Sequence, residues 1–144
     1  MIAEPRGARR PRPVYNGMVD DERERLRDLS RGLFRLHGLL MDRERRTYED
    51  RYGPVGAREL LQLLLNDPQF AWLRSLSGLM ARVDELVDSD EPVTAAGARQ
   101  LFEEAHRLLK SGDTGAFQDK YRDALQESPD VVMAHAGISA VLRR

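Results

Sequence analysis

The chain has 144 residues, of which 41% are hydrophobic, 33% charged and only 6% aromatic, and its net charge is −1. This composition is typical of one globular domain rich in helix, because leucine, alanine, arginine and glutamate favour helix over sheet. The absence of cysteine excludes disulfides, zinc–thiolate sites and cysteine nucleophiles, and it suits the reducing cytoplasm, where we expect the protein. No apolar run is long enough to predict a membrane span, and the N-terminus lacks the apolar core of a secretory signal.

Residues 1–17 are expected to form a disordered basic arm, and residues 18–144 a single helical-bundle domain. The arm has three prolines and two glycines without any periodicity. Residues 1–13 carry four arginines and one glutamate, a charge that could attract nucleic acid. They contain no aromatic side chain for base stacking, and the rest of the chain is acidic, so we do not expect a nucleic-acid partner.

A long first helix is predicted from about Asp20 to Tyr52. Acidic residues suit the positive end of the helix dipole at its start, and Gly53 followed by a proline ends it. The apolar stripe of this helix changes character along its length, because Glu44 and Tyr48 stand where the next leucines are expected. The leucines of the stripe are Leu26, Leu29, Leu33, Leu36 and Leu40.

Residues 57–65 predict a short bridging helix with leucines on more than one side. Asp67 as a cap and Pro68 in the first turn then start a second long helix, over about 68–88. Trp72 lies in its first turn and is expected to anchor the apolar face of this helix in the core.

Two further helices complete the predicted domain. Thr94 caps a third helix over about 95–110, and a fourth begins at Asp113. Ser128 and Pro129 either kink the fourth helix or begin a fifth. Because short loops favour antiparallel neighbours, we expect an all-α, up-down-up-down four-helix bundle, with the bridging helix between helices 1 and 2 and a proline break in the last helix.

The segment from 101 to 142 resembles a single tetratricopeptide-like helical hairpin. Ala105 and Leu108 fit the first helix of that family's pattern, and Gly112 with Asp113 fits its turn. The second helix of the pattern is matched by Tyr121, Ala124 and Pro129, whereas Phe117 departs from it, because the family usually has a small alanine there. The chain has no second copy of the repeat, although a repeat array needs about three. The whole chain also resembles small all-helical bacterial proteins of unassigned function.

Metal ligands are too few for the sites that helical bundles usually hold. A di-iron site needs Glu-x-x-His on two helices, and the chain has one such match, which ends at His106, with its glutamate Glu103 on the polar face. Only two other histidines exist, His37 and His135. We therefore expect no metal and no cofactor.

The polar residues that interrupt the first helix have three interpretations. In the first they are structural: Glu44 pairs with an arginine or with His106, and His37 finds a hydrogen-bond partner such as Asp84. In the second, Glu44, Tyr48 and His106 line a cleft near Trp72, in which Glu44 transfers protons. In the third they form a polar interface with a partner chain.

Two functions remain open, and the sequence leans toward the one without catalysis. The chain has no nucleophile elbow, phosphate-binding glycine loop or dinucleotide fingerprint. The first hypothesis is a non-enzymatic protein that binds another protein or itself, as an oligomer or adaptor. The alternative is a small enzyme or ligand-binding bundle that uses His37, Glu44, Tyr48 and His106. The interface candidates of the first hypothesis are the leucines of the short helix, Leu60, Leu61, Leu63, Leu64 and Leu65.

Overall fold

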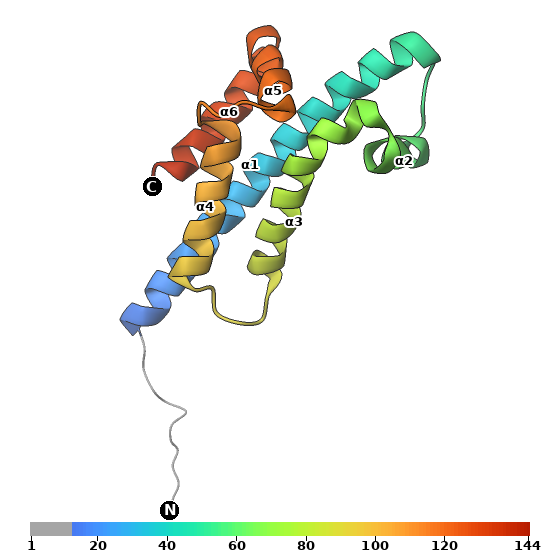
Figure 1. The fold of residues 1–144 in the computed structure, drawn as a ribbon. Helices are drawn as coiled ribbons and strands as arrows, with labels where there is room; N and C mark the ends of the chain where they lie inside the picture. Colours follow the sequence, from blue (N-terminus) through green and yellow to red (C-terminus); the bar gives the residue numbers. More distant parts are fainter. Residues whose placement is uncertain (1–12) are drawn as a thin grey trace, which may run out of the picture.

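Helices make up all the regular structure of the described chain (Figure 1). The structure, a computed structural model, describes residues 13–144, with side chains from Asp21 onward. Within residues 13–144 there is no strand, so the predicted all-α class is confirmed. The elements are α1 (Pro13–Tyr52), α2 (Ala57–Asn66), the 3-10 helix η2 (Pro68–Leu73), α3 (Arg74–Asp88), α4 (Ala95–Leu109), α5 (Ala116–Glu127) and α6 (Pro129–Leu142).

Helix α1 begins earlier than expected. It starts at Pro13 rather than near Asp20, so residues 13–17 are helical and the expected arm over 1–17 is too long. Proline fits the first turn of a helix, where its missing amide costs no intrahelical hydrogen bond. Gly17 also lies within α1. A glycine inside a helix lowers its stability by only about 1 kcal/mol relative to alanine, and the rest of a long helix offsets this loss. Residues 1–12 of the expected arm lie outside the described residues.

Two of the predicted helix starts are confirmed by their caps, whereas the fourth predicted helix begins at Ala116, after Gly115, and not at Asp113. The Asp67 carboxylate accepts a hydrogen bond from the Gln69 amide at 2.8 Å, and the Thr94 hydroxyl accepts one from the Gly97 amide at 3.0 Å. These side chains satisfy amides that have no partner inside the helix. The segment predicted as one helix over 68–88 is divided, because its proline-led first turns are the 3-10 helix η2 and the α-helix begins at Arg74.

The core lies along α1, against which α3, α4 and α6 pack (Figure 1). All five leucines of the predicted stripe are fully buried. Phe70 is fully enclosed, whereas Trp72 is only half-buried and packs against the edge of the core, so Phe70 is the central aromatic anchor. The other buried core residues include Leu73, Leu76, Leu79, Val83, Leu101, Phe102, Ala105, Phe117, Tyr121, Val131 and Ile138.

Helices α1 and α3 are antiparallel, with an offset that the sequence did not predict. Ser30 donates a hydrogen bond to Asp84 at 2.5 Å, and His37 lies 2.7 Å from Ser77 rather than beside Asp84. The expected and the observed partner of His37 are separated by about 10 Å along α3, or two helical turns. This offset arises because α1 extends beyond the start of η2, which leaves Tyr52 60% exposed.

The up-down-up-down arrangement of the first four predicted helices is not confirmed, because the chain after α4 forms two separate helices. The Ser128 hydroxyl caps α6 at the Val131 amide, and the chain reverses there. It is α6, not α5, that packs along α1. The two backbones approach closely at Gly32, where a Cβ atom would lie 2.8 Å from Ile138 Cγ1. The predicted proline break is therefore the start of a new helix.

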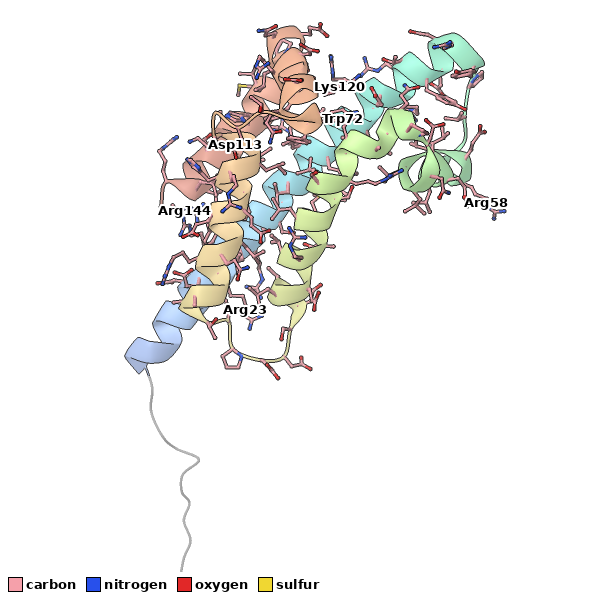
Figure 2. All side chains as sticks on the ribbon, in the orientation of Figure 1. Arg23, Arg58, Trp72, Asp113, Lys120 and Arg144 are labelled. Atoms are coloured by element: carbon pink, nitrogen blue, oxygen red, sulfur yellow. The ribbon has the colours of Figure 1, made fainter. Side chains whose placement is uncertain are left out.

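Two arginines of α1 close the C-terminal ends of other helices. Arg25 donates hydrogen bonds to the carbonyl oxygens of Val141 at 3.1 Å and Leu142 at 2.9 Å, and its guanidinium lies 3.8 Å above the Phe102 ring. Arg23, labelled in Figure 2, donates hydrogen bonds to three carbonyl oxygens at the end of α3 and in the loop that follows. The shortest of them, to the Val87 carbonyl, is 2.6 Å. The last carbonyls of a helix lack intrahelical donors and carry negative potential, so these arginines fix α3 and α6 to α1.

Candidate functional site

Glu44 occupies the place of the missing leucine on α1, and its side chain is buried. Only 7% of Glu44 is exposed, and its Oε1 atom accepts a hydrogen bond from Trp72 Nε1 at 3.1 Å. Trp72 lies where η2 meets α1 and α5 (Figure 2). A buried carboxylate needs a donor, and the indole supplies it. The expected partner of Glu44, an arginine or His106, is therefore wrong.

A row of rings continues from Trp72 into the C-terminal helices. Its indole lies 5.6 Å from the Phe117 ring, which in turn stacks on Tyr121 at 5.4 Å. The hydroxyl of Tyr121 lies 2.7 Å from His135 Nδ1. Burial raises the pKa of Tyr121, while burial and nearby Lys110 lower the pKa of His135. The phenol therefore donates to a neutral imidazole, which is a structural hydrogen bond between α5 and α6.

Tyr48 packs between aromatic neighbours instead of facing a cleft. Its ring lies 4.7 Å from that of Tyr52 and 6.0 Å from that of Phe70. Loss of hydration and the carboxylates of Glu59 and Asp67 raise the pKa of Tyr48. The phenol stays protonated at neutral pH, so it does not act as a base.

His37 forms a structural pair with Ser77. Its Nε2 atom lies 2.7 Å from the Ser77 hydroxyl, which donates to the Leu73 carbonyl at 3.2 Å. Which of the two groups donates in the His37–Ser77 bond depends on the tautomer of the imidazole. Burial lowers the pKa of His37, so the ring is neutral at pH 7. A serine bonded to the carbonyl one turn earlier in its helix is typical of structural serines, so we do not interpret the pair as a nucleophile and base.

His106 does not join the other three candidates. Its side chain is exposed on α4 and lines a surface hollow together with Glu22 and Arg25. Those two residues lie roughly 30 Å from Glu44 along α1, at about 1.5 Å per residue. The expected cleft of Glu44, Tyr48 and His106 is therefore absent from the described part of the chain.

A groove of about 490 Å³ lies elsewhere, between α3, α4 and the α4–α5 connection. Its lining includes Arg74, Arg82, Arg107 and Asp113, and Arg82 forms a salt bridge with Glu104 across it. None of the four candidate residues lines this groove. No group of three or more histidine, aspartate or glutamate side chains within residues 21–144 is placed to hold a metal ion.

Charged residues of interleaved sign follow one another on α1 from Asp42 to Arg51, and two of the arginines pair within the helix. Asp42 accepts from Arg45 at 2.6 Å and from Arg46 at 2.5 Å, and these arginines lower the pKa of Asp42. Arg43 instead reaches α5, where it pairs with Glu127 at 2.7 Å. The run therefore offers little free positive charge for a phosphate.

The leucines of α2 divide between two environments. Leu60, Leu63 and Leu64 pack partly buried against the core, whereas Leu61 is 54% exposed and Leu65 59% exposed. None of the residues of α2 is fully buried. The exposed pair lies one helical turn apart, so the two side chains form one apolar surface, which we call the α2 surface.

Sequence reasoning missed the donors that hold these residues in place. The sequence predicts that Trp72 lies in the core but gives no signal that its N–H group bonds to Glu44. Ser77 and Arg25 carried no signal either, because their partners lie far away in the sequence.

No helix in the described range is both long and apolar enough to cross a membrane. Comparison with family models, with curated proteins and with solved structures gives no match for this chain.

Proposed function

We propose that the chain is a non-enzymatic protein that acts as an adaptor by binding another protein through the α2 surface. The observation that carries this proposal is the exposure of Leu61 and Leu65, each more than half open to solvent on a helix without buried residues. Figure 1 shows α2 beside η2, away from the helices packed around the middle of α1. A partner can therefore approach it.

The energetics of the exposed leucines support a binding role. Full burial of a leucine side chain is worth about 1.5–3 kcal/mol, so covering the remaining exposed halves of Leu61 and Leu65 adds about 2 kcal/mol to binding. Exposed leucines add nothing to the stability of the free chain. The three leucines on the other side of α2 already attach the helix to the core.

The chemistry of α2 also indicates what kind of partner fits. The exposed pair is bordered by Arg58 and Glu59 at one end and by Gln62 and Asn66 beside it. Arg58 extends outward from α2 in Figure 2. An amphipathic helix with an apolar stripe and a mixed-charge border matches this surface, in the manner of helices that dock by spaced apolar anchors.

The test compares proteins retained from an extract of the source cells by three immobilised forms of the chain. These are the wild type, the Leu61→Ser/Leu65→Ser double variant and, as a matched control, Phe34→Ser, which removes an apolar side chain that is 73% exposed on α1. We expect a partner that the wild type and the control retain and the double variant loses. Thermal melts confirm folding, since surface substitutions change stability by only about 0.5 kcal/mol. Identical binding by all three forms contradicts the proposal.

A further inference from the structure

The outward face of α6 is apolar from Val132 to Ala140. Between Asp130 and Arg143, none of its exposed positions carries a charged or polar side chain. Met133 is 63% exposed and Val132 is 44% exposed. The outward faces of α4 and α5, in contrast, carry many charged residues. The apolar residues of the α6 face are Val132, Met133, Ala136, Gly137 and Ala140.

The polar side chains of α6 are those of Asp130, His135 and Ser139, and a helix with so few polar side chains is normally buried on most sides. The inner face of α6 packs on α1 and α5, but no described part of the chain covers its outer face. In a chain with 33% charged residues, an uncharged helix face indicates a contact surface. We infer that the α6 face binds the α6 face of a second copy of this chain, with the two helices antiparallel across a two-fold axis.

Charge at the ends of α6 favours this occupant and this direction. The first turn of α6 contains Asp130, and the helix is followed by Arg143 and Arg144. An antiparallel pair places the acidic start of each helix beside the basic end of the other, and it also opposes the two helix dipoles. A parallel pair would bring like charges together. Arg144 pairs with Asp28 of its own chain at 2.8 Å, so Arg143 is the residue that meets Asp130 of the other copy in this arrangement.

The shape of the face is also self-complementary. Ala136 and Gly137 lie at its centre, where small residues let two helix axes approach closely. In an antiparallel pair centred between them, Met133 of one copy lies opposite Ala140 of the other. A large side chain thus meets a small one on both sides of the axis, which is how helices interdigitate.

Sedimentation measurements test the dimer directly. We expect the wild type to associate to twice its chain mass of 16.4 kDa at chain concentrations on the order of 10–500 µM. Ala136→Arg inserts a charge at the centre of the face and should raise the dissociation constant at least about 100-fold. The matched control is Ala81→Arg, the same substitution at an exposed alanine on α3, which should leave the dimer intact. A wild type that stays monomeric, or an Ala136→Arg variant that dimerises like the control, overturns the inference.

Cysteine cross-linking tests the direction of the pair and does not depend on Ala136→Arg folding well. The chain has no cysteine, so single variants report only the introduced thiol. Ala136→Cys lies next to the two-fold axis and should form a disulfide-linked dimer on oxidation. The two copies of Asp130→Cys would lie roughly 20 Å apart, too far for a disulfide. Cross-linking through position 130 would refute the antiparallel arrangement, because a parallel pair brings positions 130 and 136 each beside their own copies.

This inference does not depend on the proposed function of α2. The Leu61→Ser/Leu65→Ser variant leaves the α6 face unchanged, so it should sediment as the wild type does. Loss of partner binding with an intact dimer, or loss of the dimer with intact partner binding, therefore separates the two proposals.

Discussion

The hydrogen bond between Trp72 and Glu44 should be a measurable part of the stability of the chain. Trp72→Phe keeps an aromatic ring against Phe117 but removes the N–H group that lies 3.1 Å from Glu44 Oε1. A carboxylate with only 7% exposure then loses its donor. Hydrogen bonds to charged groups contribute about 1.5–3 kcal/mol, and the smaller ring leaves some unfilled space. We expect a loss of about 2–4 kcal/mol, or roughly 10 °C in melting temperature for a domain of this size.

A double-mutant cycle separates the hydrogen bond from the change in ring size. Glu44→Leu removes the acceptor and restores the leucine that the stripe of α1 lacks. Measured by urea unfolding, Trp72→Phe should cost at least about 1 kcal/mol less in the Glu44→Leu background than in the wild type, because no carboxylate is then left without a donor. Equal costs in both backgrounds would show that the bond contributes nothing and that only packing is lost.

Two other predictions concern the packing of α1 and its half-buried His37. Gly32→Ala should destabilise the chain by about 1 kcal/mol in urea unfolding, because the new Cβ would lie 2.8 Å from Ile138 Cγ1. Gly38→Ala, where no atom lies within 4 Å of the new Cβ, should instead stabilise the chain by about 0.5–1 kcal/mol. Equal effects of the two substitutions would refute the close approach of α1 and α6. His37 has a pKa below its ordinary value of 6.5, so the unfolded chain binds more protons there than the folded chain, and stability should fall as pH drops from 7 through 6. His37→Gln should reduce this pH dependence, and an unchanged dependence would remove His37 as its cause.

The features that could be predicted from the sequence are those with short-range causes. The leucine stripe of α1 follows from helical periodicity. Asp67 and Thr94 begin helices because their side chains reach amides two or three residues away. The same reasoning identified Ser128 and Pro129 as a break, but both a kink and a new helix satisfy that local chemistry. Only the packing of α6 on α1, with Gly32 against Ile138, decides between them.

The features that could not be predicted depend on the offset between helices. Periodicity shows which face of a helix is buried but not how far it is shifted along its neighbour. An error of about two turns between α1 and α3 changed the expected partner of His37 from Asp84 to Ser77. The same uncertainty put Glu44 beside His106, although its donor is Trp72. The polar interruption of the leucine stripe at Glu44 is therefore recognisable in the sequence, whereas the hydrogen-bond partner of Glu44 is seen only in the structure.

The apolar character of α6 and that of α2 have different physical meanings. On α2 the apolar surface is two leucines wide and adjoins polar side chains, so it suits a small segment of a partner. On α6 it covers a whole helix face whose ends carry opposite charges, so it suits its own copy. The two surfaces lie on different sides of α1 in Figure 1, and α2 packs on η2 whereas α6 packs on α1 and α5. Both can therefore be occupied at once. A dimer formed through α6 would present two α2 surfaces, and a partner with two matching segments would bind it more tightly than a single chain without any new kind of contact.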